Sequence, residues 1–494
     1  MRTTLLLDLA ADSLGDRLAV GSLDGGLTYE RLRCAARAAG AELAASEGEN
    51  LAFIGINGDT LPLALFAAGY AGMPFVPLNY RLTDPELRRL LERSAPCVVV
   101  VDDDMAPRIE GVAGAEVWLR SEFELRFLAG EVADPGEGEE PEQDIAVLLF
   151  TSGTTGDPKA AVLRHSNLTS YVMGTVEFLA CEETEAALVS VPPYHIAGIS
   201  AILTAVYGGR RIVYLPQFTA EAWVETAAHE KITGAMVVPT MLDRILEVMD
   251  ETGESLPSLQ ALSYGGGRMP EPTIIRAMEK LPQVRFVNAY GLTETSSTIA
   301  LLDADDHRAA FASPDPKVRR RLSSVGRPLP SVELEIRGED GHVCAPEETG
   351  EIYVRGDQVS GEYLHKKALT GDGWFPTNDA GWLDEDGYLF VEGRLDDVIV
   401  RGGENISPGE IEDALRTHPA VEDVAVLGLP CEKWGEKVAA AVVCRDGAGE
   451  AELRAHLKGK LRSTKTPEAW FFREALPYNE TGKLLRRVLK AELA

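Results

Sequence analysis

The sequence predicts an α/β fold with a large N-terminal domain, in which mixed sheets are sandwiched by helices, and a small α+β domain at the C-terminus. Short apolar runs alternate with helical patterns as far as Tyr290, and glycine- and threonine-rich motifs follow several of these runs directly. The pattern changes after about Gly393. A chain of 494 residues is also too long for one hydrophobic core, so at least two domains are expected.

The large domain is predicted from strands that alternate with helices, a pattern typical of a largely parallel sheet. The runs expected as buried strands are Cys97–Val101, Ile145–Phe150, Ala186–Val191, Ile212–Leu215, Ala235–Val238, Ala261–Tyr264 and Arg285–Tyr290. Helical stretches between several of them are Thr219–His229, Met241–Asp250 and Pro272–Lys280. Two polar segments, Gly130–Asp144 and Asp303–Arg321, are expected to be surface loops.

Beyond Gly393, short strands flank two helical segments, which predicts a separate small domain. The expected strands are Asp397–Arg401, Glu422–Leu429 and Val438–Cys444, and the expected helices are Pro408–Arg416 and Glu450–Lys460. The acidic run Asp384–Gly387 is expected to be a turn between strands, because its spacing does not fit an EF-hand calcium loop.

The charge balance argues against a protein that binds nucleic acid or anionic membranes. With 48 Lys and Arg against 78 Asp and Glu, the net charge is −30, which repels nucleic acid and anionic membrane surfaces. No run approaches 18 apolar residues, so no membrane span is expected, and Asp8 and Asp12 interrupt the only stretch that resembles a signal peptide. The six cysteines show no metal or disulfide spacing, so we expect reduced, mostly buried thiols in the cytoplasm.

Chemistry-bearing residues sit where the predicted strands end, and ligands bind open α/β sheets at the carboxyl ends of their strands. The segments concerned are Thr151–Lys159, Pro192–Gly198, Gly265–Gly267 and Gly291–Thr295. The first has glycines and hydroxyls before one lysine, which suits phosphate oxygens. It is not a P-loop, because the spacing differs and Pro158 precedes the lysine.

Several other polar residues have both a functional and a structural interpretation when each is considered alone. Glu294 offers a carboxylate suited to a magnesium ion, and Asp379 could take both hydroxyls of a ribose. His195 fits a site or a hydrogen-bonded core position equally well, and Lys483 could be an ordinary solvated charge.

Taken in order, the motifs resemble the adenylate-forming superfamily of acyl-CoA synthetases, luciferase-like enzymes and peptide-synthetase adenylation domains. The motifs are TSGTTGDPK, YGLTE, DAGWLDEDGY, GRLDD, GGENISPGEIE and NETGK, and the likeness spans nearly the whole chain. The resemblance implies an acid–thiol ligase of the acyl-CoA synthetase type that uses ATP, Mg²⁺ and CoA and passes through an acyl-AMP.

The resemblance also assigns residues. The implied catalytic residues are Lys483, Glu294, His195 and Thr151, and the implied metal ligands are Thr155 and Glu294. The residues implied to contact the nucleotide or CoA are Ser152, Gly153, Thr154, Thr155, Gly156, Lys159, Gly265, Gly266, Asn288, Tyr290, Gly291, Thr293, Asp379, Arg394, Gly402 and Gly403. The residues implied to line the acyl pocket are Tyr194, Val237, Val238, Ser263 and Gly267.

Members of this superfamily alternate between two catalytic poses. The implied domains are residues 1–393 and a mobile 398–494, joined by a hinge at 394–397 that is centred on Asp396. Lys483 would reach the reacting groups in the adenylating pose, and Gly402 and Gly403 would line a thiol channel in the other.

The substrate and acceptor are less constrained. No aspartate lies near His195 to pair with a substrate ammonium, so an amino acid is not expected. Only a short tail follows Lys483, so the acceptor is expected to be separate: CoA, or a carrier protein. A luciferase-type oxygenase is the alternative function from another enzyme class. The sequence does not distinguish a monomer from a homodimer, and it does not identify the acid.

The chain departs from the family's usual residues at Ala160, Asn378 and Leu395. Of these, only Ala160 suggests a mechanism, because a methyl group in place of glycine could hinder closure of the phosphate loop or strain its backbone. One further hypothesis is therefore an enzyme that adenylates poorly and works on acyl-AMP made by a separate adenylating enzyme.

Lys483→Ala is expected to slow adenylation by about 100-fold or more, because it removes a charge that stabilises the transition state. Thiol transfer from supplied acyl-AMP should survive, since that lysine acts in the other pose. Separate assays of the two half-reactions check this, and an equal loss in both would contradict the assignment.

Overall fold

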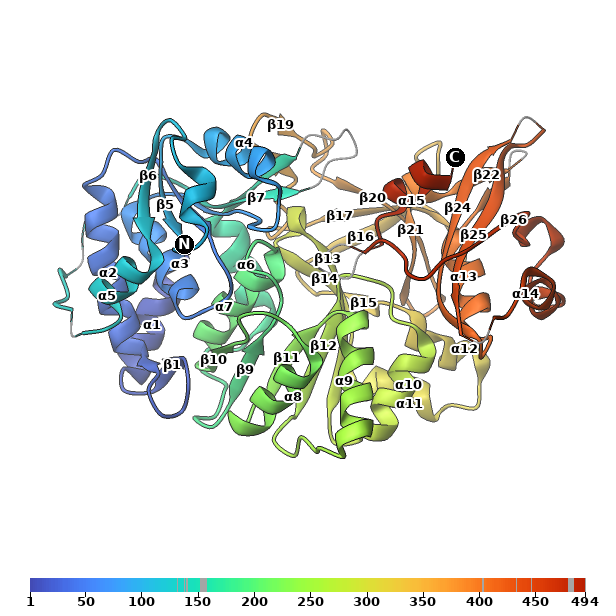
Figure 1. Ribbon diagram of the computed structural model, residues 1–494, viewed down its shortest axis with the longest axis horizontal. Helices are drawn as coiled ribbons and strands as arrows, with labels where there is room; N and C mark the ends of the chain where they lie inside the picture. The colour runs from blue at the N-terminus through green and yellow to red at the C-terminus, as the bar shows by residue number, and fades with distance from the viewer. Residues whose placement is uncertain are drawn as a thin grey trace.

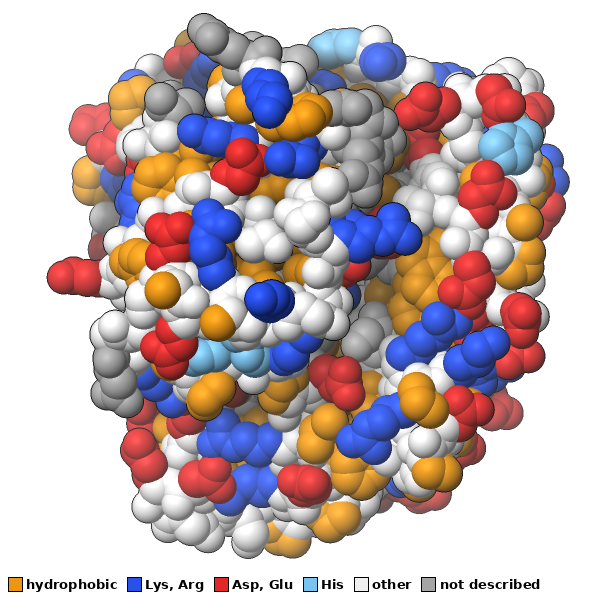
Figure 2. All heavy atoms as spheres, turned by 90° about the vertical axis from the view of Figure 1, so that its right-hand side faces the viewer, with side chains coloured by type: hydrophobic (Ala, Val, Ile, Leu, Met, Phe, Trp, Pro, Cys, Tyr) orange, Lys and Arg blue, Asp and Glu red, His pale blue; other side chains and the backbone are white. Residues whose placement is uncertain are grey.

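The computed structural model describes residues 1–130, 132–136, 138, 141–151, 158–401, 404–431, 433–445, 447–478 and 484–493, and at 404 and 405 the main chain only. The chain runs from a helical layer around α1–α3, through a central sheet, to a C-terminal unit at the opposite end (Figure 1). In the view onto that C-terminal end, acidic and basic side chains are intermingled (Figure 2).

The first large sheet carries most of the predicted strands. Within the described residues it has nine strands, in the order β15 (Arg327–Pro328), β14 (Ser297–Leu302), β13 (Arg285–Leu292), β12 (Ala261–Gly265), β11 (Gly234–Val237), β9 (Ala186–Val189), β10 (Arg211–Tyr214), β1 (Leu18–Val20) and β2 (Leu27–Thr28). The run from β13 to β1 is parallel, and the strands beyond it at each edge are antiparallel.

The second large sheet follows the same plan. Its eight described strands are, in order, β19 (Lys366–Lys367), β18 (Glu362–Tyr363), β8 (Lys159–Arg164), β7 (Ile145–Thr151), β4 (Phe75–Pro77), β3 (Asn50–Ile54), β5 (Cys97–Val101) and β6 (Ala115–Leu119). From β7 to β6 the strands are parallel, and β8 and β18 add antiparallel edges.

A smaller antiparallel sheet completes the large domain. Its order is β16 (Glu333–Arg337), β17 (Gly350–Arg355), β20 (Phe375–Leu383) and β21 (Leu389–Arg394). The short 3₁₀ helix η4 (Leu395–Asp397) follows β21 directly, so this sheet leads into the segment predicted as the hinge.

The helices cover the large sheets because their apolar faces need partners. Those that share one buried core with both sheets are α1 (Thr4–Leu14), α2 (Tyr29–Ala44), α3 (Thr60–Ala71), α5 (Arg120–Phe127), α6 (His165–Thr175) and α7 (Ile196–Gly208). The outer face of the nine-stranded sheet packs against α8 (Ala220–His229), α9 (Pro239–Thr252), α10 (Glu271–Lys280) and α11 (Ala304–Ala312), and the outer face of the other packs against α4 (Asp84–Ser94). The shortest is α12 (Pro316–Arg319), and η1 (Ala106–Ile109) and η3 (Arg320–Ser323) are 3₁₀ turns.

Residues from Ile399 onward have cores of their own, on the two faces of one sheet. Its strands are β23 (Glu404–Ile406), β22 (Ile399–Arg401), β25 (Gly435–Cys444) and β24 (Val421–Cys431), with β26 (Ala469–Phe472) beside β25. The accompanying helices are α13 (Pro408–Arg416), α14 (Glu450–Leu457), α15 (Arg486–Leu493) and the 3₁₀ turn η5 (Ser463–Lys465).

The two parts of the chain meet where α13 packs against β21. Arg268 forms an ion pair with Asp413 across this seam. The Ser407 hydroxyl donates to the Glu392 carbonyl at 3.4 Å. The polar contacts at this seam suit a surface that can separate.

The predicted strands and the helix over Pro408–Arg416 are found to within a few residues, but three expectations need correction. The segment Asp303–Arg321 is not a loop: it forms α11 and α12, because the Asp303 side chain caps the first of these helices and accepts from the Asp306 N–H at 2.8 Å. The helix from Glu450 ends at Leu457 rather than Lys460, because Lys458 has an extended backbone. The cysteines are free thiols as expected, yet two are buried and four are half-buried.

None of the helices in the described parts of the chain combines the length and the apolar character that crossing a membrane requires.

Candidate active site

Thr151 and Lys159, the first and last residues of the phosphate-loop motif, are register partners at the ends of the antiparallel strands β7 and β8. The Lys159 ammonium lies 5.8 Å from the centre of the Tyr363 ring, which β18 holds beside β8. The predicted phosphate residues between them, Ser152, Gly153, Thr154, Thr155 and Gly156, lie outside the described residues.

Glu294 contacts the same tyrosine and is almost fully buried, in the 3₁₀ turn η2 (Thr293–Thr295) that follows β13. The Tyr363 hydroxyl donates to its Oε1 at 2.6 Å. Its main-chain carbonyl accepts from the N–H groups of Ser360 and Gly361. Burial and the Glu294 carboxylate raise the pKa of Tyr363 well above its ordinary value, so the phenol remains a hydrogen-bond donor to that carboxylate.

A carboxylate held in this way fits a magnesium ion, which prefers oxygen ligands and is commonly shared between one or two carboxylates and phosphate oxygens. Lys159 nearby supplies the positive charge that a polyphosphate needs. These residues come from β8, β18 and η2, so the fold brings together groups that are far apart in the sequence.

A second carboxylate, Asp379 on β20, has three partners. Its Oδ2 accepts from the Tyr290 hydroxyl at 2.6 Å, and its Oδ1 lies 3.1 Å from the Arg394 Nε. Its own N–H donates to the Thr377 hydroxyl at 3.1 Å, and Arg394 donates to the Thr377 carbonyl at 2.8 Å. Burial and the Asp379 carboxylate raise the pKa of Tyr290 well above its ordinary value. This arrangement presents a buried, oriented carboxylate, as recognition of a ribose diol requires.

Asn378, the residue before it, has a left-handed backbone with φ 59°. It lies in a bulge where the pairing of β17 with β20 shifts register. Its N–H donates to the Glu351 carboxylate at 3.0 Å, and its side-chain amide donates to Asp396 at 3.1 Å. Asparagine tolerates this conformation better than most residues, which explains why it can stand where glycine is usual.

The predicted acyl pocket is only partly supported. Tyr194 is buried, with its ring edge-to-face against Tyr80 at 5.8 Å and 4.8 Å from the His195 ring. Tyr194 and Tyr80 belong to the buried core under α4, and Val237 is fully buried in the core that α8 and α9 cover. Since side chains alternate across a strand, its neighbour Met236 lies on the opposite face of β11, in register with Ser263. Met236 is therefore a second candidate lining residue on this strand.

Three glycines follow Tyr264 at the end of β12, and a side chain would meet different surroundings at each of the three positions. A side chain at Gly265 would meet the Ala289 carbonyl at 2.3 Å, so that position needs close backbone packing. Gly266 has φ +75°, and a side chain there would lie 3.5 Å from Val238. At Gly267 a side chain would meet Pro239 only at 3.8 Å, so this is the one of the three with room.

Several other assigned residues have structural partners. Asn288 donates from its side-chain amide to the Ser324 carbonyl at 2.9 Å, and a side chain at Gly291 would collide with the Ser297 carbonyl. Ala160 lies in β8 with an ordinary strand backbone, so the strained-backbone reason for poor adenylation is wrong. Gly402, Gly403 and Lys483 lie outside the described residues.

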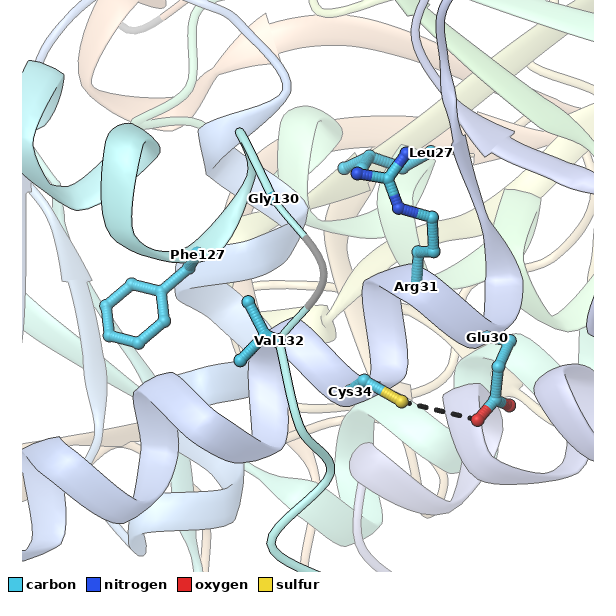
Figure 3. A pocket seen from close by; sticks show the side chains of 7 residues that line it. All are labelled: Leu27, Glu30, Arg31, Cys34, Phe127, Gly130 and Val132. Carbon is cyan, nitrogen blue, oxygen red and sulfur yellow. Dashed lines mark hydrogen bonds between the residues drawn. The ribbon is translucent and has the colours of Figure 1, made fainter.

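A cavity of about 250 Å³ elsewhere lies over α2 and α5, away from both carboxylates (Figure 3). It is lined by Leu27, Glu30, Arg31, Cys34, Phe127, Gly130 and Val132. The Cys34 thiol donates to Glu30 within it at 3.3 Å.

The motif order, the fold and the two carboxylate clusters define an adenylate-forming ligase. The model for the AMP-binding enzyme family matches residues 7–364, and that for the AMP-binding enzyme C-terminal domain matches residues 410–483. The chain belongs to this family, in its acyl-CoA ligase branch.

The relatives agree over nearly the full length. A feruloyl-CoA synthase from Amycolatopsis sp is 34% identical over 93% of this chain and 92% of that protein. A 2-succinylbenzoate–CoA ligase from Bacillus cereus is 32% identical over 90% of this chain and 88% of that protein. The solved structure of O-succinylbenzoate coenzyme A synthetase from Bacillus subtilis, in complex with ATP and magnesium ion, has a TM-score of 0.85 at 30% identity and covers 98% of this chain and 99% of that chain.

These findings confirm the predicted fold class and the predicted acid–thiol ligase that acts on a non-amino-acid substrate through an acyl-AMP. The predicted cofactors, ATP with Mg²⁺ and CoA, are those that this reaction class uses.

Sequence reasoning did not find Tyr363, Thr377 or Met236. Tyr363 lies on a two-residue strand outside every motif, so no pattern marks it. The tertiary contact with Glu294 alone reveals it. Met236 could have been found by counting the strand alternation from Ser263.

Tyr363→Phe is expected to raise the KM for magnesium–ATP by about 10-fold or more, because a hydrogen bond to a charged group is worth about 1.5–3 kcal/mol. ATP–pyrophosphate exchange at several Mg²⁺ concentrations measures this. Tyr70→Phe is the matched control, since the Tyr70 hydroxyl donates to a different carboxylate, that of Asp8, at 2.6 Å. An unchanged KM would show that Tyr363 does not support the nucleotide site.

Proposed function

We propose that this chain activates a carboxylic acid bearing an aromatic ring as its acyl-AMP and transfers the acyl group to CoA by rotation of its C-terminal domain. The observation that carries the aromatic class is the set of rings formed by Tyr80, Tyr194 and His195 at the predicted acyl pocket. The Tyr80–Tyr194 contact is edge-to-face and the Tyr194–His195 contact is tilted, and aromatic rings favour such offset arrangements.

The named substrates of the relatives support this class. Ferulate and 2-succinylbenzoate both carry a benzene ring, and the proteins named for them match this chain over most of its length. The pocket also offers the flexible thioether of Met236, which adapts to planar rings. The Ser263 hydroxyl lies on the same face but donates to the Ala235 carbonyl at 3.3 Å.

In the first half-reaction, a carboxylate oxygen bonds to the α-phosphorus of ATP as the bond from that phosphorus to pyrophosphate breaks. Lys159 neutralises phosphate charge, and Asp379 orients the ribose. Mg²⁺ would be held by Glu294, with Thr155 as a second candidate, and supplies charge neutralisation at the phosphates. In the second half-reaction, the CoA thiol loses its proton to solvent, and its sulfur bonds to the acyl carbon as the carbon–oxygen bond to AMP breaks and AMP leaves.

Domain rotation is proposed about residues 394–397, between units 1–393 and 398–494. Two observations support it. The polar seam between Arg268 and Asp413 can break, and Arg486 ties the C-terminal unit to the predicted hinge through Asp397 at 3.6 Å. Asp396 accepts from Asn378 in this pose, so rotation that moves Asp396 would break that bond.

The experiment that tests the substrate class is a panel of acids offered with ATP, first without and then with CoA. Ferulate, 2-succinylbenzoate and benzoate should give acyl-AMP and then acyl-CoA by mass spectrometry, with kcat/KM at least about 10-fold above octanoate and malonate. Equal or better use of the aliphatic acids would overturn the aromatic class. Acyl-AMP without acyl-CoA would point to a carrier-protein acceptor, and acyl-CoA only from supplied acyl-AMP to a poor adenylator.

Asn378→Gly should loosen the hinge, since glycine keeps the left-handed backbone but removes the bond to Asp396. The lost hydrogen bond contributes about 0.5–1.5 kcal/mol to the stability of this pose, which predicts that amide exchange at residues 394–398 becomes faster by about 2- to 10-fold. Asn378→Asp should act in the same direction by placing like charges together. Hydrogen–deuterium exchange measures both variants, and unchanged exchange in the two would exclude Asn378 as a hinge contact.

A further inference from the structure

We propose that the turn between β16 and β17 holds a zinc-type divalent cation through His342, Cys344 and Glu348. The bound ion would cross-link the two ends of this turn, and its site does not include any residue assigned to the ligase reaction. The ligand atoms of these three side chains all lie within 4.8 Å of one another.

The backbone places the histidine and the cysteine on one side. Val343 forms an antiparallel bridge with Arg337, and the carbonyl of His342 accepts from the Gly338 N–H at 2.9 Å. His342 and Cys344 flank that bridge residue, so their side chains emerge on the same side of the extended chain.

The ligand atoms are also close to coordination distances. The His342 Nε2 lies 3.1 Å from the Glu348 Oε1, and the Cys344 Sγ lies 4.0 Å from the same nitrogen. A tetrahedral zinc with bonds of about 2.0–2.3 Å separates its ligand atoms by about 3.3–3.8 Å. Only small side-chain movements are therefore needed, and solvent can fill the fourth position because His342 and Glu348 are about half exposed.

Each flexible ligand already has an orienting partner. Asp340 contacts the His342 Nδ1, which leaves Nε2 for the metal. The second Glu348 oxygen accepts from the Ala345 N–H at 2.9 Å. A carboxylate behind a ligating histidine is the usual outer partner in zinc sites.

Two glycines leave the space that the ligands occupy. A side chain at Gly338 would come within 2.4 Å of the His342 ring. One at Gly350 would first meet the Arg337 carbonyl at 2.5 Å and then the Cys344 sulfur at 2.9 Å, so Gly350 is needed for the backbone pairing and also leaves room for the thiol.

The ligand set selects the metal class. Imidazole nitrogen, thiolate sulfur and carboxylate oxygen together suit zinc rather than magnesium or calcium, which take oxygen ligands. Binding would displace the proton between Nε2 and Glu348 and release the thiol proton to solvent.

Another trio, Glu30, Cys34 and Asp134, is less suited. It has no histidine, and its carboxylates already pair with Arg33 and Arg37. Figure 3 shows Cys34 turned toward Glu30.

The test uses the full chain, stripped of metal with a chelator and titrated with Co²⁺ and then Zn²⁺. We expect one Co²⁺ per chain, with a near-ultraviolet thiolate-to-cobalt charge-transfer band that Zn²⁺ abolishes. Cys344→Ser should remove the band, and His342→Ala should weaken Zn²⁺ binding by at least about 10-fold. Asp340→Asn should weaken it by about 10-fold through the lost outer partner.

Cys34→Ser is the matched control and should keep both the band and the affinity, because it removes a thiol beside two carboxylates elsewhere. A band that persists in Cys344→Ser, a band lost in Cys34→Ser, or no band in the unmodified chain would each overturn the proposal. Ligase activity of every variant, measured without added metal other than Mg²⁺, verifies that it is folded.

Discussion

The contacts of Asp379 join two sheets of this molecule. Tyr290 reaches it from the nine-stranded sheet, and Asp379 itself lies on β20 of the small antiparallel sheet, where Arg394 contacts it from the neighbouring strand β21, next to the predicted hinge. One buried carboxylate thus connects the nucleotide side of the large sheet to the segment that leads into the C-terminal unit. Because a buried carboxylate is costly without partners, these elements are held in a definite arrangement.

The same region links binding to motion. A ligand that takes the oxygens of Asp379 competes with Tyr290 and Arg394 for them. Arg394 also holds the Thr377 carbonyl, next to Asn378 and its contact with Asp396. The predicted ribose contact at Asp379 and the predicted hinge at Asp396 are therefore linked by neighbouring hydrogen bonds.

Departures from family pattern are best interpreted through backbone conformation. Ala160 stands out in the sequence because a methyl group replaces the usual glycine, yet it lies in a regular strand, where the backbone conformation does not require glycine. Asn378 suggests no mechanism in the sequence, yet its φ of 59° is where glycine would matter. Residue identity cannot distinguish these two cases, because φ at each position is set by the pairing of neighbouring strands.

Much of the fold could be predicted because strand periodicity and apolar runs are local. The strands near Cys97, Ile145 and Arg285 follow from runs of apolar residues alone. In the segment Asp303–Arg321, the capping residues Asp303 and Asp315 are local signals for the two helices, but the burial of His307 and Ala310 that fixes α11 against distant elements is not visible in the sequence. The prediction for Val237 remains a prediction: its side chain lies in the core that α8 and α9 cover, and a shift of one residue turns a side chain to the other face of a strand.

The sequence by itself determined the class of chemistry, because the ordered motifs from Thr151 to Lys483 specify it without any structure. Only the tertiary structure decided the partners of the two carboxylates. Tyr363 reaches Glu294, and Tyr290 reaches Asp379, across 69 and 89 residues of chain. Contacts over such separations depend on how whole sheets pack, and no local pattern of residues encodes them.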